Sequence, residues 1–329
     1  MKPEIIVTTK LFARTQERLD KEFTCHKLHE AADRAAFLKE MAPRVRALAT
    51  FGPAGADAKL MDTLPKLEII SNFGVGVDAI DLAAAKQRKI IVTNTPDVLN
   101  DCVADTAMAL TVNVMRKFPQ AEAYLRTGAW AAKGGYPLTT SLGGKTMGIL
   151  GLGRIGEAIA KRAQSFGMQI RYHNRTKKDV AYPYDADAVA LARNSDVLMV
   201  VTPGGAETEK LVNARVLDAL GPEGYVVNIA RGSVVDEPVL LKYLQEKKIA
   251  GAGLDVYEHE PKVPAEFYSL DNCVLFPHVA SARTRGANSF RNTVRSAASC
   301  SLWQVNSRSS RSWVRGNIFV VTMISGFMP

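Results

Sequence analysis

The sequence predicts an α/β protein in which parallel β-strands alternate with helices. Short apolar runs alternate with helical patterns along most of the chain, which is typical of parallel sheets covered by helices on both faces. A glycine-rich turn at 151–156 stands between an apolar run and a helical pattern, as in a βαβ unit. The 329 residues, 47% hydrophobic and 23% charged, are enough for two globular domains.

The first 99 residues carry this alternation. Apolar runs predict strands over 4–7, 46–50, 67–71 and 90–92, and helical patterns lie over 15–23, 31–41 and 59–64. Ligands bind at the carboxyl ends of parallel strands, where this region has Phe51-Gly52 and the segment 72–78. The glycines of 72–78 free several backbone N–H groups, which suits a small carboxylate, and a plain turn is equally compatible.

The region from 94 to 144 joins the two predicted domains. The helix-breaking residues of 94–97 predict a hinge, after which helical patterns cover 103–115 and 120–126. A loop is expected over 128–144. Trp130 and Tyr136 in this loop are either core residues or an oligomer contact, and we favour the contact.

The segment 146–176 reads as strand, glycine turn, helix and strand. Apolar residues at 147–150 and 168–172 predict the strands, and a helical pattern covers 155–166. Between them stands the motif Gly151-x-Gly153-x-x-Gly156. This context favours a dinucleotide-binding turn over a glycine turn of another kind.

Each glycine of this motif has a separate expected role. Gly151 allows a tight turn, Gly153 lets a pyrophosphate approach the backbone, and Gly156 lets the helix pack closely on the strand. Arg154 and Ile155 lie where the helical pattern starts, and the free N–H groups and positive dipole end of that helix favour phosphate binding. We therefore expect all five residues to contact a cofactor.

The end of the second strand of this unit predicts which dinucleotide binds. An NAD site usually has Asp or Glu here, about 20 residues into the unit, to hold the ribose 2′-hydroxyl. This chain has Asn174 instead, followed by Arg175 and Thr176. No carboxylate repels a 2′-phosphate, and a guanidinium and a hydroxyl are able to hold one. We therefore predict NADP(H), with NAD(H) as the weaker alternative; a solvated basic turn is the other interpretation.

The alternation continues to residue 281. Strands are predicted over 197–201, 225–229, 250–256 and 274–276, and helices over 188–192, 214–220 and 237–246. Several residues follow or end these strands: Thr202 and Pro203, Ile229 and Arg231, Asp255, and His278. The carboxyl ends of parallel strands share one edge, so we expect these residues to converge there, with Thr202, Pro203, Ile229 and Asp255 near the cofactor.

Three of the residues near these strand ends form a set suited to carbonyl reduction. Hydride addition to a ketone produces an alkoxide that needs a proton, and His278 is the candidate acid. Glu260 is the candidate carboxylate that orients the ring and raises its pKa. Arg231 could hold a substrate carboxylate and polarise the keto oxygen. Each has an ordinary structural alternative when considered alone; together with a dinucleotide site they form a complete reductase set.

Composition restricts the other classes of function. No run approaches the ~18 apolar residues of a membrane span. The four cysteines are scattered, which suggests neither zinc nor a disulfide framework and fits a reducing cytoplasm, and we expect no metal. The net charge is +9, but seven arginines lie within 283–329 without any Lys, Asp or Glu, so residues 1–282 carry 9 − 7 = +2. We therefore expect no nucleic-acid partner.

The motifs together resemble the D-isomer-specific 2-hydroxyacid dehydrogenases, most closely the NADPH-dependent glyoxylate/hydroxypyruvate reductases. The resemblance covers roughly residues 40–282. It rests on 72–78, the glycine motif at 151–156, 228–232, 253–256, Glu260-Pro261 and Pro277-His278, in that order. The resemblance implies two Rossmann-like domains with the active site in the cleft between them. We expect a substrate-binding domain over 1–99 and an NADP-binding domain over 100–283.

The resemblance also implies roles for individual residues. His278 is the acid/base, Glu260 its partner and Arg231 the substrate holder. The N–H groups of Val75 and Gly76 bind the substrate carboxylate, Ser281 lies near the substrate, and Asp255 contacts the nicotinamide amide. Members of the family are dimers built on an arm of the cofactor domain, which suits the 128–144 loop. The implied reaction is the reduction of small 2-keto acids, such as glyoxylate and hydroxypyruvate, to D-2-hydroxy acids.

Two alternatives are retained. The resemblance ends at about Ala282, where the family continues with an acidic amphipathic helix. The sequence of 284–329 is instead rich in Ser and Arg, without any carboxylate side chain. Our hypothesis is out-of-frame translation, and a basic arm for nucleic acid is the less favoured interpretation. A dinucleotide-sensing protein similar to the C-terminal-binding corepressors is the second hypothesis for the whole chain, since such proteins can keep the Arg–Glu–His set.

Overall fold

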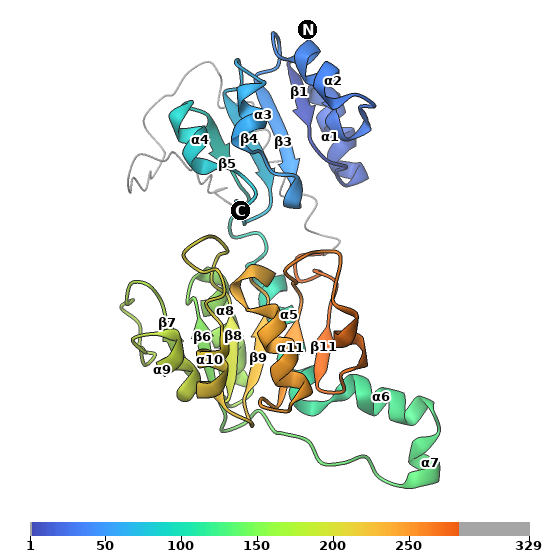
Figure 1. Cartoon of the computed structure of the whole chain (residues 1–329), viewed down its shortest axis with the longest axis vertical. Coiled ribbons are helices and arrows are strands. Elements are labelled where there is room, and N and C mark those ends of the chain that lie inside the picture. Colours follow the sequence, from blue (N-terminus) through green and yellow to red (C-terminus); the bar gives the residue numbers. More distant parts are fainter. Residues whose placement is uncertain (1, 283–329) are drawn as a thin grey trace, which may run out of the picture. The chain divides into compact units, whose positions relative to one another are not determined.

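The computed structural model describes residues 2–282, which form two compact units that divide after Leu99 (Figure 1). The atypical segment 284–329 predicted from the sequence lies outside the described residues. No helix in the described part of the chain is long and apolar enough to cross a membrane.

The first unit is built on a five-stranded parallel sheet with the order β2-β1-β3-β4-β5. Its strands are β1 (Glu4–Val7), β2 (Thr24–Lys27), β3 (Ala47–Phe51), β4 (Ile69–Phe73) and β5 (Ile91–Thr93). The chain leaves β1 in one direction to form β2 and returns on its other side to form β3. The strand order therefore reverses between β1 and β3, and ligands bind beyond the carboxyl ends at such a reversal.

Helices cover both faces of this sheet because alternate strand residues are apolar on both sides. The helices are α1 (Ala13–Glu22), α2 (Arg34–Met41), α3 (Ala58–Asp62) and α4 (Leu82–Gln87), with short 3₁₀ turns at Leu28–Glu30 and Gly52–Ala54. Ile6 of β1 belongs to the core cluster on one face, whereas Ile5 and Val7 belong to the cluster on the other. Asp33, Asp57 and Asp81 begin α2, α3 and α4 by accepting hydrogen bonds from first-turn amides.

The second unit has a six-stranded parallel sheet with the order β11-β10-β9-β8-β6-β7. Its strands are β6 (Thr146–Leu150), β7 (Gln169–His173), β8 (Val197–Val200), β9 (Tyr225–Asn228), β10 (Gly251–Leu254) and β11 (Cys273–Leu275). The order reverses at β6, which lies between β7 and β8. The predicted α/β class with parallel, doubly wound sheets is confirmed.

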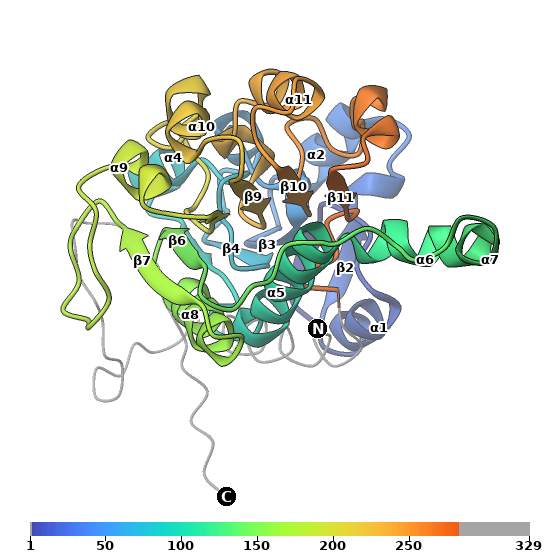
Figure 2. The same cartoon turned by 90° about the horizontal axis from the view of Figure 1, so that it is seen from below.

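Two layers of helices enclose the second sheet. The helices are α5 (Asn100–Arg116), α6 (Phe118–Arg126), α7 (Ala129–Lys133), α8 (Arg154–Ser165), α9 (Ala188–Arg193), α10 (Ala214–Leu220) and α11 (Glu237–Gln245), with 3₁₀ turns at Gly232–Val234 and Ala265–Ser269. Helices α5 and α8 pack together on one face, and α9, α10 and α11 cover the other (Figure 2). Helices α6 and α7 extend away from the sheet of this unit (Figure 2).

Three elements differ from the expectations. Strand β2 was not predicted because its sequence, TCHK, is polar and half exposed at the sheet edge, so it has no apolar run. Helix α4 was not predicted either, because its six residues, LAAAKQ, are too few to show a clear helical period. The loop expected over 128–144 contains α7, which begins after Gly128 in a left-handed conformation (φ 73°).

Candidate active site

The glycine turn has the geometry that a dinucleotide requires. A Cβ added at Gly151, where φ is +104°, would lie 2.7 Å from the Thr202 nitrogen, and one added at Gly156 would lie 2.7 Å from the Gly151 oxygen. At Gly153 a Cβ would meet nothing within 4 Å. Side chains are therefore excluded where the turn packs on β8 and α8, and the backbone is open where a pyrophosphate would approach.

Helix α8 presents its N-terminus at this turn. Ile159, Ala160 and Ala163 are buried and anchor the helix on β6. The first-turn amides, including those of Ile155 and Gly156, have no partner inside a helix, and the helix dipole places partial positive charge there. The residues present thus fit a bound dinucleotide phosphate.

Asn174 and Arg175 follow β7 but are held differently. The Asn174 side chain accepts a hydrogen bond from the Leu152 amide (2.6 Å) and donates one to the Leu152 carbonyl (3.3 Å). It therefore ties the end of β7 to the glycine turn. Arg175 is exposed and forms an ion pair with Glu207, and Thr176 is exposed beside it. No carboxylate stands at position 174, so the predicted distinction from an NAD site rests on Arg175 and Thr176.

His278 is paired with Glu260, beyond the carboxyl ends of β11 and β10. The His278 Nδ1 atom lies 2.6 Å from Glu260 Oε2. The other carboxylate oxygen of Glu260 accepts a hydrogen bond from the Tyr257 amide (3.0 Å), which orients it. Since Nδ1 faces the carboxylate, Nε2 is the ring nitrogen left for a substrate.

This pairing shifts the pKa values of both groups in opposite directions. The hydrogen bond to Glu260 raises the pKa of His278 above its ordinary value, outweighing the burial that would lower it. Burial alone would raise the pKa of Glu260, but the hydrogen bonds from His278 and from the Tyr257 amide lower it. A protonated imidazole beside an ionised carboxylate is the form that can donate a proton.

Asp255 supports the loop that carries His278. Its carboxylate is fully buried and accepts hydrogen bonds from the amides of Val279 (2.7 Å) and Ala280 (2.9 Å). His278 itself has a φ of 52°, an uncommon conformation for a residue with a side chain, and the two following hydrogen bonds stabilise it. Both Asp255 oxygens thus serve the backbone in this structure; the expected contact of Asp255 with a nicotinamide amide stays a prediction.

Arg231 and Ile229 follow β9 on the same edge of the sheet. The Arg231 guanidinium donates a hydrogen bond to the Ala230 carbonyl (2.6 Å), and its side chain packs over Gly204. The Asn228 side chain donates to the Arg231 carbonyl (3.0 Å). Arg231 is half-buried, so its charge acts in a partly desolvated place, where it lowers the pKa of Glu260 slightly further.

In the first unit, the segment after β4 presents the amides of Val75 and Gly76. The Asn94 side chain donates to the Val75 carbonyl (2.8 Å), and the Asn72 side chain donates to the Gly76 carbonyl (2.8 Å). Because a carbonyl shares its peptide plane with the following N–H, these two bonds fix the directions of the N–H groups of Gly76 and Val77. Ser281, in the second unit, is half-buried in the turn after His278. The roles of these three residues stay predictions.

Three residues that contact the site residues were not among the predicted site residues. Asn72 and Asn94 shape the Val75–Gly76 segment, and Glu207 pairs with Arg175. Asn72 lies in the predicted carboxylate-binding segment 72–78, and Glu207 lies only a few residues beyond Thr202-Pro203. Within residues 2–282, no group of three His, Cys, Asp or Glu side chains could hold a metal ion.

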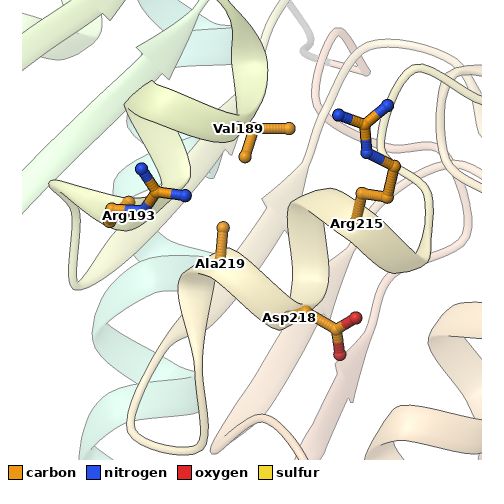
Figure 3. A pocket seen from close by; sticks show the side chains of 5 residues that line it. All are labelled: Val189, Arg193, Arg215, Asp218 and Ala219. Carbon is orange, nitrogen blue, oxygen red and sulfur yellow. The ribbon is translucent and has the colours of Figure 1, made fainter.

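A separate hollow of about 500 Å³ lies on the surface of the second unit between α9 and α10 (Figure 3). Its lining is Val189, Arg193, Arg215, Asp218 and Ala219. All five residues belong to the two helices and none to the strand ends. The hollow is therefore distinct from the candidate site described above.

A parallel sheet with a glycine turn at its reversal point and a His–carboxylate pair at neighbouring strand ends defines a dinucleotide-dependent oxidoreductase. Residues 108–280 match the family described as D-isomer specific 2-hydroxyacid dehydrogenase, NAD binding domain. The chain belongs to the D-isomer-specific 2-hydroxyacid dehydrogenase family, as its motifs predicted.

Named relatives fall in the same family. The chain is 47% identical to a hydroxyphenylpyruvate reductase of Plectranthus scutellarioides, over 81% of this chain and 85% of that protein. It is 43% identical to a glyoxylate/hydroxypyruvate reductase A of Arabidopsis thaliana, over 88% and 93%. A similar solved structure is the NADPH-dependent glyoxylate/hydroxypyruvate reductase of Sinorhizobium meliloti in complex with NADP and malonate, with 46% identity, a TM-score of 0.85, and coverage of 91% and 93%.

Proposed function

We propose that this protein is an NADPH-dependent reductase that converts small 2-keto acids, such as glyoxylate and hydroxypyruvate, into D-2-hydroxy acids. The observation that carries the proposal is the His278–Glu260 pair, which stands at the same sheet edge as the open glycine turn. The similarity to the Sinorhizobium meliloti reductase, solved with NADP, supports it.

The residues of the chain divide the reaction between them. Bound NADPH supplies the hydride that adds to the keto carbon. His278, protonated beside Glu260, donates its proton to the keto oxygen as negative charge develops there, and so the hydroxyl forms and the imidazole becomes neutral. Arg231 polarises that oxygen and holds the substrate carboxylate. In the first unit, the amides of Val75 and Gly76 serve to bind a carboxylate. Ser281, in the turn that follows His278, contacts the substrate.

The preference for NADP(H) over NAD(H) rests on the end of β7. Arg175 and Thr176 are exposed and able to hold a 2′-phosphate, and Asn174 replaces the carboxylate that would repel it. Gly151, Gly153, Arg154, Ile155 and Gly156 hold the pyrophosphate, and the segment 202–203, Ile229 and Asp255 line the remainder of the cofactor site.

A coupled test covers both substrate class and cofactor. Loss of NADPH absorbance is measured with glyoxylate, hydroxypyruvate and hydroxyphenylpyruvate, and each assay is repeated with NADH. We expect turnover that is faster with NADPH. Binding of NADPH by a folded sample without any turnover would contradict the proposal and favour a dinucleotide-sensing protein.

Replacing Glu260 with glutamine is expected to move the pH dependence of reduction. Glu260 raises the pKa of His278, so the protonated form is present below that pKa and is lost as the pH rises through it. Without the carboxylate this pKa falls, and the alkaline limb of the kcat/KM profile should shift to lower pH. The same limb is measured for Glu258→Gln, a nearby acid outside the pair, which should leave it unchanged. An unshifted limb in E260Q is incompatible with the assigned role.

We also propose that the protein forms a homodimer through α6, α7 and the segment that follows, and that it is cytoplasmic. This arm exposes Phe118, Leu125, Trp130 and Leu138, of which Leu138 is fully exposed. Tyr124 and Tyr136 pack edge to face within the arm, with ring centroids 5.4 Å apart, and stabilise its conformation. Among the described residues, Cys25 and Cys273 form no disulfide, which suits a reducing compartment, and fractionation of the native cell would test this location.

Replacing Trp130 with glutamate is expected to halve the mass measured in solution by light scattering. Trp130 is 61% exposed, so the change should not unfold the chain but would place a charge in an apolar contact. Tyr268→Glu, which alters an exposed aromatic residue outside the arm, is the matched control and should keep the dimer. A wild-type protein that is already monomeric would rule out the dimer.

A further inference from the structure

The loops after β7 and β8 are joined by an ion pair across the end of β6. Arg175 lies two residues beyond the end of β7, and Glu207 lies in the loop after β8. In the sheet, β6 lies between these two strands, and β6 leads into the glycine turn at Gly151. The Arg175–Glu207 pair therefore spans the carboxyl end of the strand at which the sheet order reverses, where a dinucleotide binds.

We infer that Glu207 is a specificity-determining residue: it is the counterion that Arg175 must release before it can bind the 2′-phosphate of NADP(H). This inference rests on the proposed function, in which Arg175 holds that phosphate. NAD(H) has a 2′-hydroxyl in place of the phosphate and does not require the release. Glu207 thus weakens the binding of NADP(H) but not that of NAD(H), and so limits the preference of the protein for NADP(H).

Because the Arg175–Glu207 pair is exposed, replacing Glu207 with a 2′-phosphate at Arg175 costs little free energy. The Arg175 side chain is 84% exposed and that of Glu207 is 76% exposed. Ion pairs this exposed contribute little, because water and salt screen them. A phosphate monoester carries nearly two negative charges and three acceptor oxygens, so it can replace a single carboxylate at a guanidinium. Glu207 is then left beside the phosphate, where its charge is repulsive until it turns toward solvent.

The neighbouring lysines are engaged elsewhere. Lys178 donates to the Leu152 carbonyl (3.2 Å) and forms an ion pair with Glu157, and Lys177 lies over the Tyr184 ring with its Nζ 5.9 Å from the centroid. Glu207 is the acid paired with Arg175. Glu209, two residues later, is exposed and has no ion pair within residues 2–282. Glu209 is therefore a matched control for Glu207, because its replacement removes one negative charge from the same loop without breaking an ion pair.

The test measures binding rather than turnover, by titration calorimetry with two fragments of the cofactor. The probe 2′,5′-ADP carries the 2′-phosphate, and 5′-AMP lacks it. We expect Glu207→Gln to tighten 2′,5′-ADP by roughly three- to tenfold, the scale of one exposed charge interaction with a phosphate, and to leave 5′-AMP unchanged. Glu209→Gln should change neither affinity by more than roughly twofold.

The outcomes separate this inference from the proposed cofactor preference. If wild-type protein binds 2′,5′-ADP more tightly than 5′-AMP and loses the difference in Arg175→Ala, the preference for NADP(H) holds. If E207Q then binds both probes as wild type does, or tightens both equally, the role of Glu207 is overturned. If the wild type does not distinguish the probes, the 2′-phosphate argument fails, and the role of Glu207 fails with it. Thermal unfolding of each variant confirms that the fold is intact.

Discussion

Replacing His278 with alanine is expected to lower kcat for 2-keto acid reduction by roughly 10²–10⁴-fold, the usual contribution of a positioned general acid. The substrate oxygen would then develop negative charge without a proton donor. Affinity for NADPH should be unchanged, because the glycine turn and Arg175 belong to other loops of the sheet. Single-turnover absorbance and fluorescence titration of NADPH measure the two effects separately.

His259 provides the matched control for this experiment. It is an exposed histidine one residue before Glu260, outside the His278–Glu260 pair. His259→Ala should retain wild-type turnover. Turnover that survives in H278A, or that falls equally in both variants, would show that His278 is not the proton donor.

Replacing Arg231 with glutamine is expected to lower kcat/KM by roughly 10²–10³-fold, the scale measured when one preorganised donor to a developing oxyanion is removed. Glutamine keeps a donor but loses the charge and the bidentate fork that match a carboxylate. Because the lost contacts act on both substrate and transition state, KM for the keto acid should rise as kcat falls.

The control for Arg231 is Arg215→Gln. Arg215 lines the hollow between α9 and α10, and its guanidinium has no hydrogen bond or ion pair within the described residues. The variant removes the same charge from the same unit and should retain wild-type kcat/KM. If R231Q also retains it, Arg231 neither holds nor polarises the substrate.

Much of the fold was predictable because the apolar residues follow the periods of their elements. The run at 147–150 became β6, and the apolar pattern of 155–166 became α8, whose Ile159 and Ala163 are buried. Strong periodicity makes an element predictable because burial of its apolar face is the main contribution to its stability. Where burial is slight, as in β2, the sequence carries little signal, and the strand forms because its backbone pairs with β1.

For the candidate site, the sequence predicted which residues lie at the same edge of the sheet, but not which side chains contact one another. Parallel topology requires the carboxyl ends of β9, β10 and β11 to share an edge, and this predicted that Arg231, Asp255 and His278 lie along one edge of the sheet. The contact between His278 Nδ1 and Glu260 Oε2, and the buried Asp255 that holds the next two amides, depend on loop conformations. Loop conformation has no period that a sequence could display.

The sequence by itself determined the α/β class, the family and the presence of Asn rather than an acid at position 174, because periodicity and motif spacing are local properties of the chain. Only the tertiary structure decided which charged groups face each other. Arg175 and Glu207 are separated by a strand, a helix and two loops, and they meet because β7 and β8 flank β6 in the sheet. Such a pairing follows from strand order and side-chain direction, which are set by the packing of the whole unit.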